Sequence, residues 1–269
     1  MQIDPHQVSD VIRRIAGEEV MSRFRQLADH EVSEKAAGEI VTIADTEAER
    51  RLGEEFCALL PGSKIVGEEG AATDPASLNA LDGDAPVWVV DPVDGTKNFS
   101  EGKSCFAVMV ALVEKCQIEA AWIHDPIADT TIHATRGEGA WEKGIRLVRP
   151  TVPAIEEMSG SFPRNLTRQL REDRASGMPG IPNLVDRYRC VGREYMDMAR
   201  GKLNFLRYGG QLKPWDHVPG ILINREIGGF DALIETGDPY SINSKISSNI
   251  IMLAENSETW EKLTQLSDD

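Results

Sequence analysis

Two aspartates stand three residues apart directly after an apolar run, in the stretch WVVDPVDGTKNF. The carboxylates of Asp91 and Asp94 offer the hard oxygen ligands that suit Mg²⁺. Gly95 can adopt a positive φ, and the backbone amides of Gly95 and Thr96 can then face an anion. A metal beside anion-binding amides indicates a phosphate as the ligand.

Further acidic residues follow short apolar segments or lie in a Trp-Asp motif. Asp45 follows IVTIA, Glu68 and Glu69 follow KIVG, and Asp216 lies in KPWDHVPG. Active sites often use such positions, because the scaffold fixes the chain where the side chain is exposed. The alternative for any one of them is a helix cap or a solvated turn. The spacing excludes an EF-hand and disfavours a zinc site, and the chain has no Walker A sequence.

The elements that must position these residues follow from the hydrophobic periodicity, which predicts an α+β first half and an α/β second half. Helical spacing predicts helices over 4–27, 46–60, 185–200 and 215–227. Strands are predicted at KIVG and over 87–91, 105–114, 117–125, 130–135, 204–209, 231–235 and 249–254, with a hairpin over 136–148. We expect the strands from Val87 onward to form an antiparallel meander, and Pro92 to end the first of them at Asp91. Prolines between 150 and 182 predict mobile loops at a domain boundary.

The composition bounds the possible functions. The chain has 269 residues and a net charge of −15, which argues against a general binder of nucleic acid or anionic membranes. If the substrate is itself an anion, a bound metal is the obvious feature to attract it. The four scattered cysteines predict reduced thiols, and neither an export signal nor a membrane-spanning run of about 20 apolar residues is visible. We therefore expect a cytoplasmic protein.

Several motifs together resemble the inositol monophosphatase family of Mg²⁺-dependent, Li⁺-sensitive phosphatases. They are EKAAGEIVTIADTEAE, GEE, WVVDPVDGTKNF, RGEGAW and WDHVPG, which occur in the family's order over roughly residues 30 to 235. The resemblance implies a layered α-β-α-β-α sandwich of the sugar-phosphatase type, with an antiparallel N-terminal sheet and a smaller C-terminal α/β half. It implies an N-terminal metal- and phosphate-binding domain over 1–149 and a substrate-side domain over 150–269. It also leads us to expect a homodimer.

The resemblance also assigns metal ligands. Glu68, Asp91 and the Val93 carbonyl would hold one Mg²⁺, and Asp91, Asp94 and Asp216 would hold a second. Glu68 would help to retain a weaker third ion. Mn²⁺ could replace Mg²⁺, and Li⁺ is expected to inhibit.

The remaining roles implied by the resemblance concern the phosphate and the attacking water. The amides of Gly95 and Thr96 would bind the phosphate. The Thr96 hydroxyl and Asp45, together with Glu68 and its metal, would position and deprotonate the water. Lys35 lies where the family often carries a basic residue over the metal site, and a solvated surface lysine is its alternative.

The chain departs from the family where inositol-specific members carry a G-[ST]-A motif and a glutamate seven residues before the Trp-Asp aspartate. Here these positions hold Gly192-Arg193-Glu194 and Gly209. Arg193, Glu194 and Lys213 are therefore new charged candidates at the mouth of the site. Arg193 or Lys213 could bind a second anionic group of the substrate, or could simply be solvated.

Two classes of function remain open at this point. The first is a Mg²⁺-dependent phosphomonoesterase that acts on a small phosphorylated metabolite: an inositol phosphate, histidinol phosphate, a sugar bisphosphate such as fructose 1,6-bisphosphate, or a 3′-phosphoadenosine-type nucleotide. The second is a catalytically silent, metal-binding regulatory module. The complete set of acidic and hydroxyl positions favours the enzyme.

Overall fold

The computed structural model describes residues 3–36, 39–149, 151–246 and 248–266. Within these ranges the strands form three sheets. A two-stranded hairpin pairs β1 (Val32–Ala36) with β2 (Glu39–Thr42). The large sheet has seven strands: β3 (Lys64–Gly67), β4 (Val87–Asp94), β5 (Ala107–Glu114), β6 (Gln117–Asp125), β7 (Thr130–Thr135), β8 (Gly139–Glu142) and β9 (Ile145–Leu147). The small sheet has five, in the order β11 (Asn183–Leu184), β10 (Ser159–Ser161), β12 (Phe205–Tyr208), β14 (Ile251–Ala254) and β13 (Phe230–Leu233).

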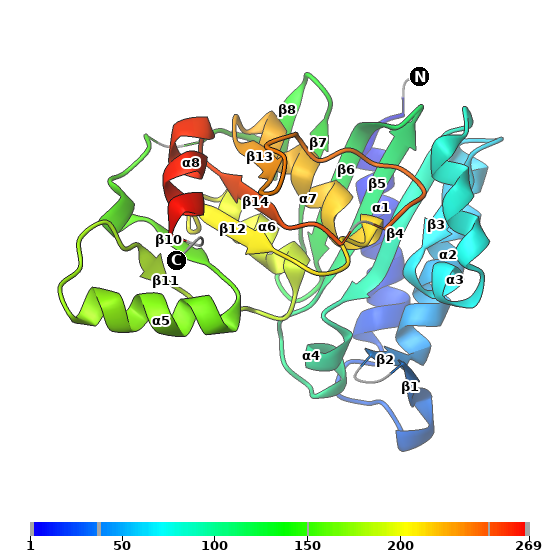
Figure 1. Cartoon of the computed structure of the whole chain (residues 1–269). Coiled ribbons are helices and arrows are strands. Elements are labelled where there is room, and N and C mark those ends of the chain that lie inside the picture. Colours follow the sequence, from blue (N-terminus) through cyan, green and yellow to red (C-terminus); the bar gives the residue numbers. More distant parts are fainter. Residues whose placement is uncertain (1–2, 37–38, 150, 247, 267–269) are drawn as a thin grey trace.

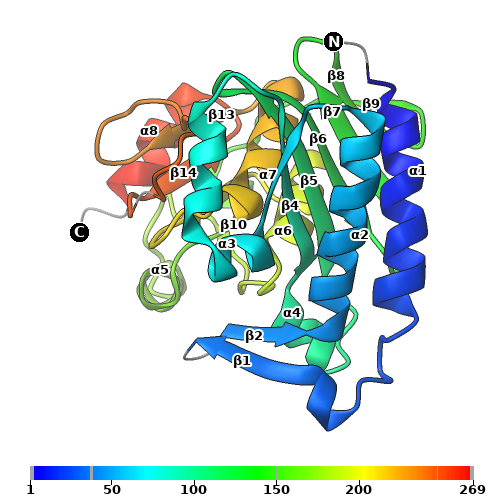
Figure 2. The same ribbon diagram turned by 90° about the vertical axis from the view of Figure 1, so that its right-hand side faces the viewer.

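The helices lie in three layers around these sheets (Figures 1 and 2). The α-helices of the described residues are α1 (Pro5–Ile15), α2 (Ile43–Leu59), α3 (Glu68–Thr73), α4 (Thr96–Ser100), α5 (Arg164–Ala175), α6 (Val191–Ala199), α7 (Pro214–Glu226) and α8 (Ser257–Gln265). A π-helical segment, Ala16–Met21, continues α1, and short 3₁₀ segments occupy Asp29–Glu31, Pro75–Asp82 and Ile155–Glu157. Helices α1 and α2 cover one face of the large sheet, α6 and α7 lie between the two larger sheets, and α5 and α8 cover the outer face of the small sheet. The expected α-β-α-β-α sandwich is confirmed.

Alternation along the strands creates separate cores on the two faces of the large sheet. In β4, Val87 and Val89 pack towards α6 and α7, while Trp88 and Val90 pack against α1 and α2. Successive side chains of a strand point to opposite faces, so a strand buried on both sides is apolar throughout. A third core lies between the small sheet, α5 and α8.

The predicted antiparallel meander is confirmed, since β4 to β9 pair with their chain neighbours in antiparallel order. The expectation that the strand ends at Asp91 is wrong, because β4 extends to Asp94. The effect of Pro92 appears instead as a shift in the pairing with β5 between Asp91 and Asp94. Proline removes one ladder donor, and the strand accommodates this by an irregularity.

Other predicted segments also differ, among them the helix expected from Thr46, which begins at Ile43. The first helix does not run to Leu27, because regular and π-helical structure ends at Met21. The helix expected over 185–200 begins only at Val191. The stretch expected to consist of loops contains β10 and all of α5, whose apolar residues are too few to mark it in the sequence. Residue 150, where we placed the domain boundary, lies outside the described residues.

No helix in the described part of the chain is long and apolar enough to cross a membrane. The four cysteines are unpaired, as expected from their spacing.

Candidate active site

Three carboxylates meet at the end of the parallel strand pair β3–β4. The register pairs Gly67 with Val90, so the next residues, Glu68 at the start of α3 and Asp91 within β4, follow each other side by side. Asp216 joins them from the first turn of α7. One carboxylate oxygen from each of the three lies within 4.8 Å of the others. Side chains far apart in the sequence thus converge, as the motifs predicted.

Electrostatic repulsion within this cluster makes it suited to a divalent cation. Burial raises the pKa of Asp91 well above its usual range, and the negative Glu68, Asp94 and Asp216 raise it further. Burial, followed by Glu68 and Asp94, also raises the pKa of Asp216. Crowded carboxylate oxygens in a buried site are the donor set that Mg²⁺ prefers. The residues present therefore fit a magnesium ion.

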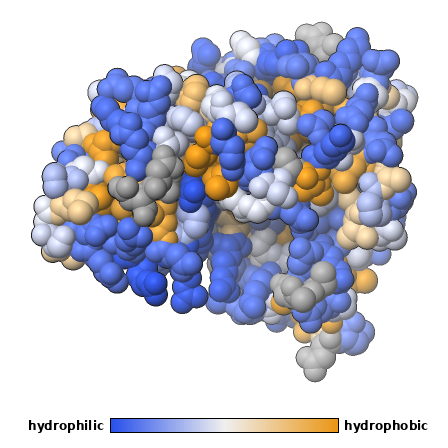
Figure 3. Space-filling model, viewed as in Figure 1, coloured by the Kyte–Doolittle hydropathy of each residue, from blue (hydrophilic) through white to orange (hydrophobic). Residues whose placement is uncertain are grey.

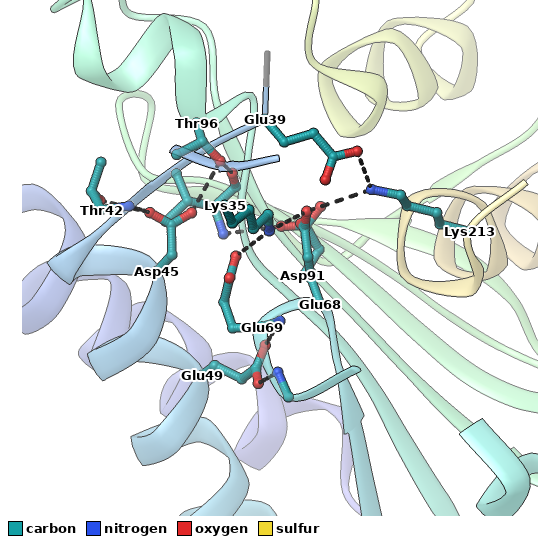
Figure 4. A network of polar contacts seen from close by, with 12 residues as sticks. Lys35, Glu39, Thr42, Asp45, Glu49, Glu68, Glu69, Asp91, Thr96 and Lys213 are labelled. Atoms are coloured by element: carbon teal, nitrogen blue, oxygen red, sulfur yellow. Dashed lines mark hydrogen bonds and ion pairs between the residues drawn. The ribbon is translucent and has the colours of Figure 1, made fainter. Parts of the chain in front are cut away.

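Asp45 is a helix cap and also a partner of Thr96. One oxygen, Oδ2, accepts hydrogen bonds from the Thr42 backbone amide (2.9 Å) and hydroxyl (2.6 Å), closing a capping box at the start of α2. The other, Oδ1, lies 3.0 Å from the Thr96 hydroxyl, which is also 2.9 Å from the Val93 carbonyl. Burial raises the pKa of Asp45 to about 7 in spite of these hydrogen bonds. This carboxylate can therefore gain and lose a proton near neutral pH. Figure 4 shows its contacts with Thr42 and Thr96.

Gly95 makes the turn between β4 and α4 that brings Thr96 to this position. It has φ 87° and is the first flanking residue of α4, where no side chain caps the helix. Asn98 holds the turn in place by donating from Nδ2 to the carbonyls of Cys105 (2.9 Å) and Tyr188 (2.9 Å). The positive φ that the sequence allowed at Gly95 is confirmed, and α4 begins at the next residue, Thr96.

Asp94 points to the start of α6 and lies outside the group of three carboxylates. Its oxygens accept hydrogen bonds from the amides of Val191 (3.1 Å) and Gly192 (2.6 Å), and the Cys190 thiol lies 2.9 Å away. Burial raises its pKa to about 6, although these donors oppose the shift. Asp94 thus connects the segment Asp94–Thr96, which the sequence predicts to bind a phosphate and which we call the phosphate loop, to the second half of the chain.

Two lysines reach the carboxylate cluster from opposite sides (Figure 4). Lys35, on the β1–β2 hairpin, places Nζ 2.8 Å from Glu68 and 2.7 Å from Glu69. Lys213 lies just before α7 and forms an ion pair of 3.1 Å with Glu39, with Glu68 at 4.0 Å. Lys35 is therefore paired over the site and is not a solvated surface lysine.

The structure gives Arg193 and Glu194 partners away from the carboxylate cluster. Arg193 pairs with the buried Asp125 at 2.9 Å. Glu194 is buried on α6 and accepts hydrogen bonds from Arg187 (3.0 Å) and the Tyr208 hydroxyl (2.8 Å). Both residues are therefore held in ion pairs and are not solvated.

Glu49 was missed by the sequence reasoning. Its oxygens accept the amides of Glu69 (2.8 Å) and Gly70 (2.7 Å), so it caps α3, the helix that begins with Glu68. A Cβ at Gly67 would lie 2.2 Å from its carboxyl carbon, which explains the glycine. One signal was present in the sequence: Glu49 follows Asp45 by four residues and therefore lies on the same helix face.

Comparisons with known proteins agree with this geometry. The model of the inositol monophosphatase family matches residues 6–264. The inositol-1-monophosphatase of Rhizobium meliloti is 30% identical, over 87% of each chain. The fructose-1,6-bisphosphatase/inositol-1-monophosphatase of Thermotoga maritima is 28% identical, over 81% of this chain and 82% of that protein. The solved structure of Thermotoga maritima IMPase TM1415 superposes with a TM-score of 0.78 at 24% identity, covering 98% of this chain and 96% of that one.

The fold and the relatives define a phosphoric monoester hydrolase of the metal-dependent sugar-phosphatase type. Within that class, the match over nearly the whole chain and the Rhizobium relative show that this protein belongs to the inositol monophosphatase family.

Proposed function

We propose that the chain hydrolyses a small phosphorylated metabolite with Mg²⁺ bound at Glu68, Asp91 and Asp216, which the geometry supports, and at Asp94 and the Val93 carbonyl, which family membership implies. The observation that carries the proposal is the convergence of three carboxylates beside the Asp45–Thr96 pair. Magnesium, when bound there, supplies the positive charge that neutralises the phosphate and favours deprotonation of water. The proposal includes two to three bound ions, which Mn²⁺ can replace, and inhibition of the enzyme by Li⁺. These parts rest on family membership.

The residues of the chain divide the work on the water and the phosphate. The attacking water donates to the Thr96 hydroxyl oxygen while that hydroxyl donates to Oδ1 of Asp45, so the proton ends on the aspartate. The pKa of about 7 at Asp45 matches a base that acts near neutral pH. The amides of Gly95 and Thr96, at the uncapped start of α4, hold the phosphate oxygens. Glu68 contributes by holding the ion next to the water.

The leaving group of the substrate would extend over Asp94 towards α6. A cavity of about 450 Å³ lies there, lined by Cys190, Val191, Glu194 and Gly209 among others. Gly209 lacks the carboxylate that inositol-specific members carry at this position, so we propose a substrate other than a simple inositol monophosphate. Histidinol phosphate, fructose 1,6-bisphosphate and 3′-phosphoadenosine-type nucleotides are the alternatives.

Phosphate release from a panel of these monoesters, with and without Mg²⁺, tests the proposal. Asp91→Asn should lower kcat by at least about a hundredfold, because one ligand oxygen and its charge are lost. Asp84→Asn, which changes an exposed aspartate outside the site, is the control. Unchanged activity of Asp91→Asn would overturn the metal assignment. If the wild type releases no phosphate from any ester, the silent regulatory module becomes the better description.

Three further proposals rest on the family and on the sequence. The division into domains 1–149 and 150–269 is supported by the change of sheet between β9 and β10. A homodimer can be tested by light scattering, and cytoplasmic localisation by fractionation. The oligomeric state and the localisation do not affect the assignment of the site.

A further inference from the structure

A second cavity, of about 740 Å³, lies along α5 beside the small sheet. Its α5 wall presents residues at positions i, i+3, i+4 and i+7, which form one face of the helix. The opposite wall is the segment that leads into α6. Five arginines line the cavity: Arg164, Arg168, Arg171, Arg187 and Arg189. We call this cavity the arginine groove. Figure 3 shows that the surface over α5, at the lower left, is strongly hydrophilic.

The arginine groove carries an excess of positive charge that its own residues do not neutralise. Glu172 and Asp186 are its acidic lining residues, against the five arginines. Asp186 pairs with Arg171 at 2.9 Å, and Arg187 pairs with Glu194 at 3.0 Å.

Three exposed arginines of the groove, Arg164, Arg168 and Arg189, have no ion pair with any described residue. Three unpaired guanidinium groups in one cavity are notable in a chain whose net charge is −15.

The groove adjoins the cavity that is lined by Cys190 and Val191, two residues that contact Asp94. The two cavities share Arg187 and Arg189 in their walls. Arg189 directly precedes Cys190, whose thiol lies 2.9 Å from the Asp94 carboxylate. Asn98 also donates to the Arg189 carbonyl at 3.2 Å, which ties this wall to the phosphate loop. The arginine groove therefore lies next to the backbone segment that holds Asp94.

We propose that the substrate carries a second anionic group, a phosphate or phosphodiester separate from the one removed, which binds Arg164, Arg168 and Arg189. This inference rests on the proposed function and specifies its substrate class. A guanidinium fork matches the oxygens of a phosphate and binds it by charge-assisted hydrogen bonds. The sequence suggested Arg193 or Lys213 as the ligand of a second anionic group. We assign that role to the three arginines instead, because Arg193 and Lys213 already have acidic partners.

The size and charge of the molecule favour a small ligand over a polyanion. Cavities of about 450 and 740 Å³ fall within the range of small-molecule sites. A nucleic acid would meet the negative charge of the remaining surface as well as the groove.

The test compares pairs of substrates that differ only in the second phosphate: fructose 1-phosphate with fructose 1,6-bisphosphate, and adenosine 3′-phosphate with adenosine 3′,5′-bisphosphate. We expect kcat/KM to be at least about tenfold higher for one bisphosphate than for its monophosphate, as a charge-assisted hydrogen bond allows. Arg164→Gln, Arg168→Gln and Arg189→Gln should each remove about tenfold on the bisphosphate and change the monophosphate less than about twofold.

Arg146→Gln is the matched control. Arg146 is an exposed arginine on β9, at the far edge of the large sheet. It should leave both substrates unchanged. All of these residues are exposed, so the variants should fold, which circular dichroism can confirm.

The outcomes separate this inference from the proposed function. Equal kcat/KM for each pair, or equal losses on both members, would overturn the second-anion site while the phosphatase assignment stands. Stronger inhibition by RNA than by inorganic pyrophosphate, abolished in Arg168→Gln, would also overturn it in favour of a polyanion surface. Mg²⁺-dependent release from neither member of any pair would overturn the proposed function and the inference together.

Discussion

Replacing Gly95 by alanine tests whether the turn of the phosphate loop depends on the fit between the two halves of the chain. Gly95 has φ 87°, and a Cβ there would lie 3.0 Å from the Cys105 carbonyl, 3.1 Å from the Arg189 carbonyl and 3.1 Å from the Cys190 Cβ. All three neighbours are backbone or Cβ atoms, so none can move away by a rotamer change.

Gly62 offers a matched control on the same backbone conformation. It has φ 89°, and a Cβ there would meet nothing within 4 Å. Gly62→Ala therefore introduces only the left-handed backbone strain, about 1 kcal/mol. Gly95→Ala adds crowding of the kind that costs about 1–3 kcal/mol in packed interiors. We expect Gly95→Ala to lower the free energy of unfolding by roughly 2 kcal/mol more than Gly62→Ala.

Urea unfolding of the two variants and the wild type measures this difference, and phosphate release measures its effect on the site. Gly95→Ala should lose most activity under conditions where it is still folded, because the amides and Thr96 move with the turn. Gly62→Ala should keep wild-type kcat. Equal unfolding free energies for the two variants, or full activity of folded Gly95→Ala, would refute the argument from the crowded turn.

Three other perturbations follow from the site and the core. Glu49→Gln should lower the free energy of unfolding by about 1 kcal/mol and raise the Mg²⁺ concentration for half-maximal activity, because one amide of α3 loses its acceptor. Wild-type values for both quantities would contradict the capping role. Lys35→Met should lower that Mg²⁺ concentration by up to about fivefold, because its ammonium competes with the ion for Glu68; a higher Mg²⁺ requirement would show that Lys35 supports binding instead. His124→Gln should become more stable relative to the wild type by roughly 2 kcal/mol between pH 7 and pH 4.5, as followed by urea unfolding. Burial lowers the His124 pKa from 6.5 to about 4. Between these values the unfolded wild type binds a proton that the folded protein excludes, so the stability of the wild type decreases as the pH is lowered. A difference in unfolding free energy between variant and wild type that does not change with pH would contradict this.

The layered fold and the large sheet could be predicted because their signals are local. The strands β5, β6 and β7 are nearly continuous apolar runs or alternations, and their short connections favour antiparallel pairing. Glu68 and Asp91 each follow a short apolar run, which is why the sequence marked them as candidate site residues. Their meeting at one site was implied only by the family resemblance. Local periodicity does not report how a strand tolerates a proline, which is why the end of β4 was predicted three residues too early.

Partners contributed by tertiary packing could not be predicted from the sequence. Asp94 accepts the amides of α6, almost a hundred residues away in the chain, and nothing near either segment indicates this pairing. The Arg193–Asp125 ion pair is of the same kind. Helix α5 was missed for another reason: it is polar on most of its surface and buries only Thr167 and Leu170 fully.

The miss at α5 and the uncertainty about the substrate have the same physical origin. A helix that exposes arginines to a cavity lacks the apolar stripe that marks helices in a sequence. Two of these arginines, Arg164 and Arg168, have no acidic partner among the described residues, and this makes the cavity suited to an anion. The residues that we propose for the hydrolysis lie on β4 or in the first turns of α2, α3, α4 and α7, and they are visible as motifs. Two of the three arginines that we propose for the second anion lie instead on the polar helix α5. A hydrolase built in this way can keep its reaction while its substrate changes, because substitutions on α5 alter the groove without disturbing the carboxylates at the sheet edge.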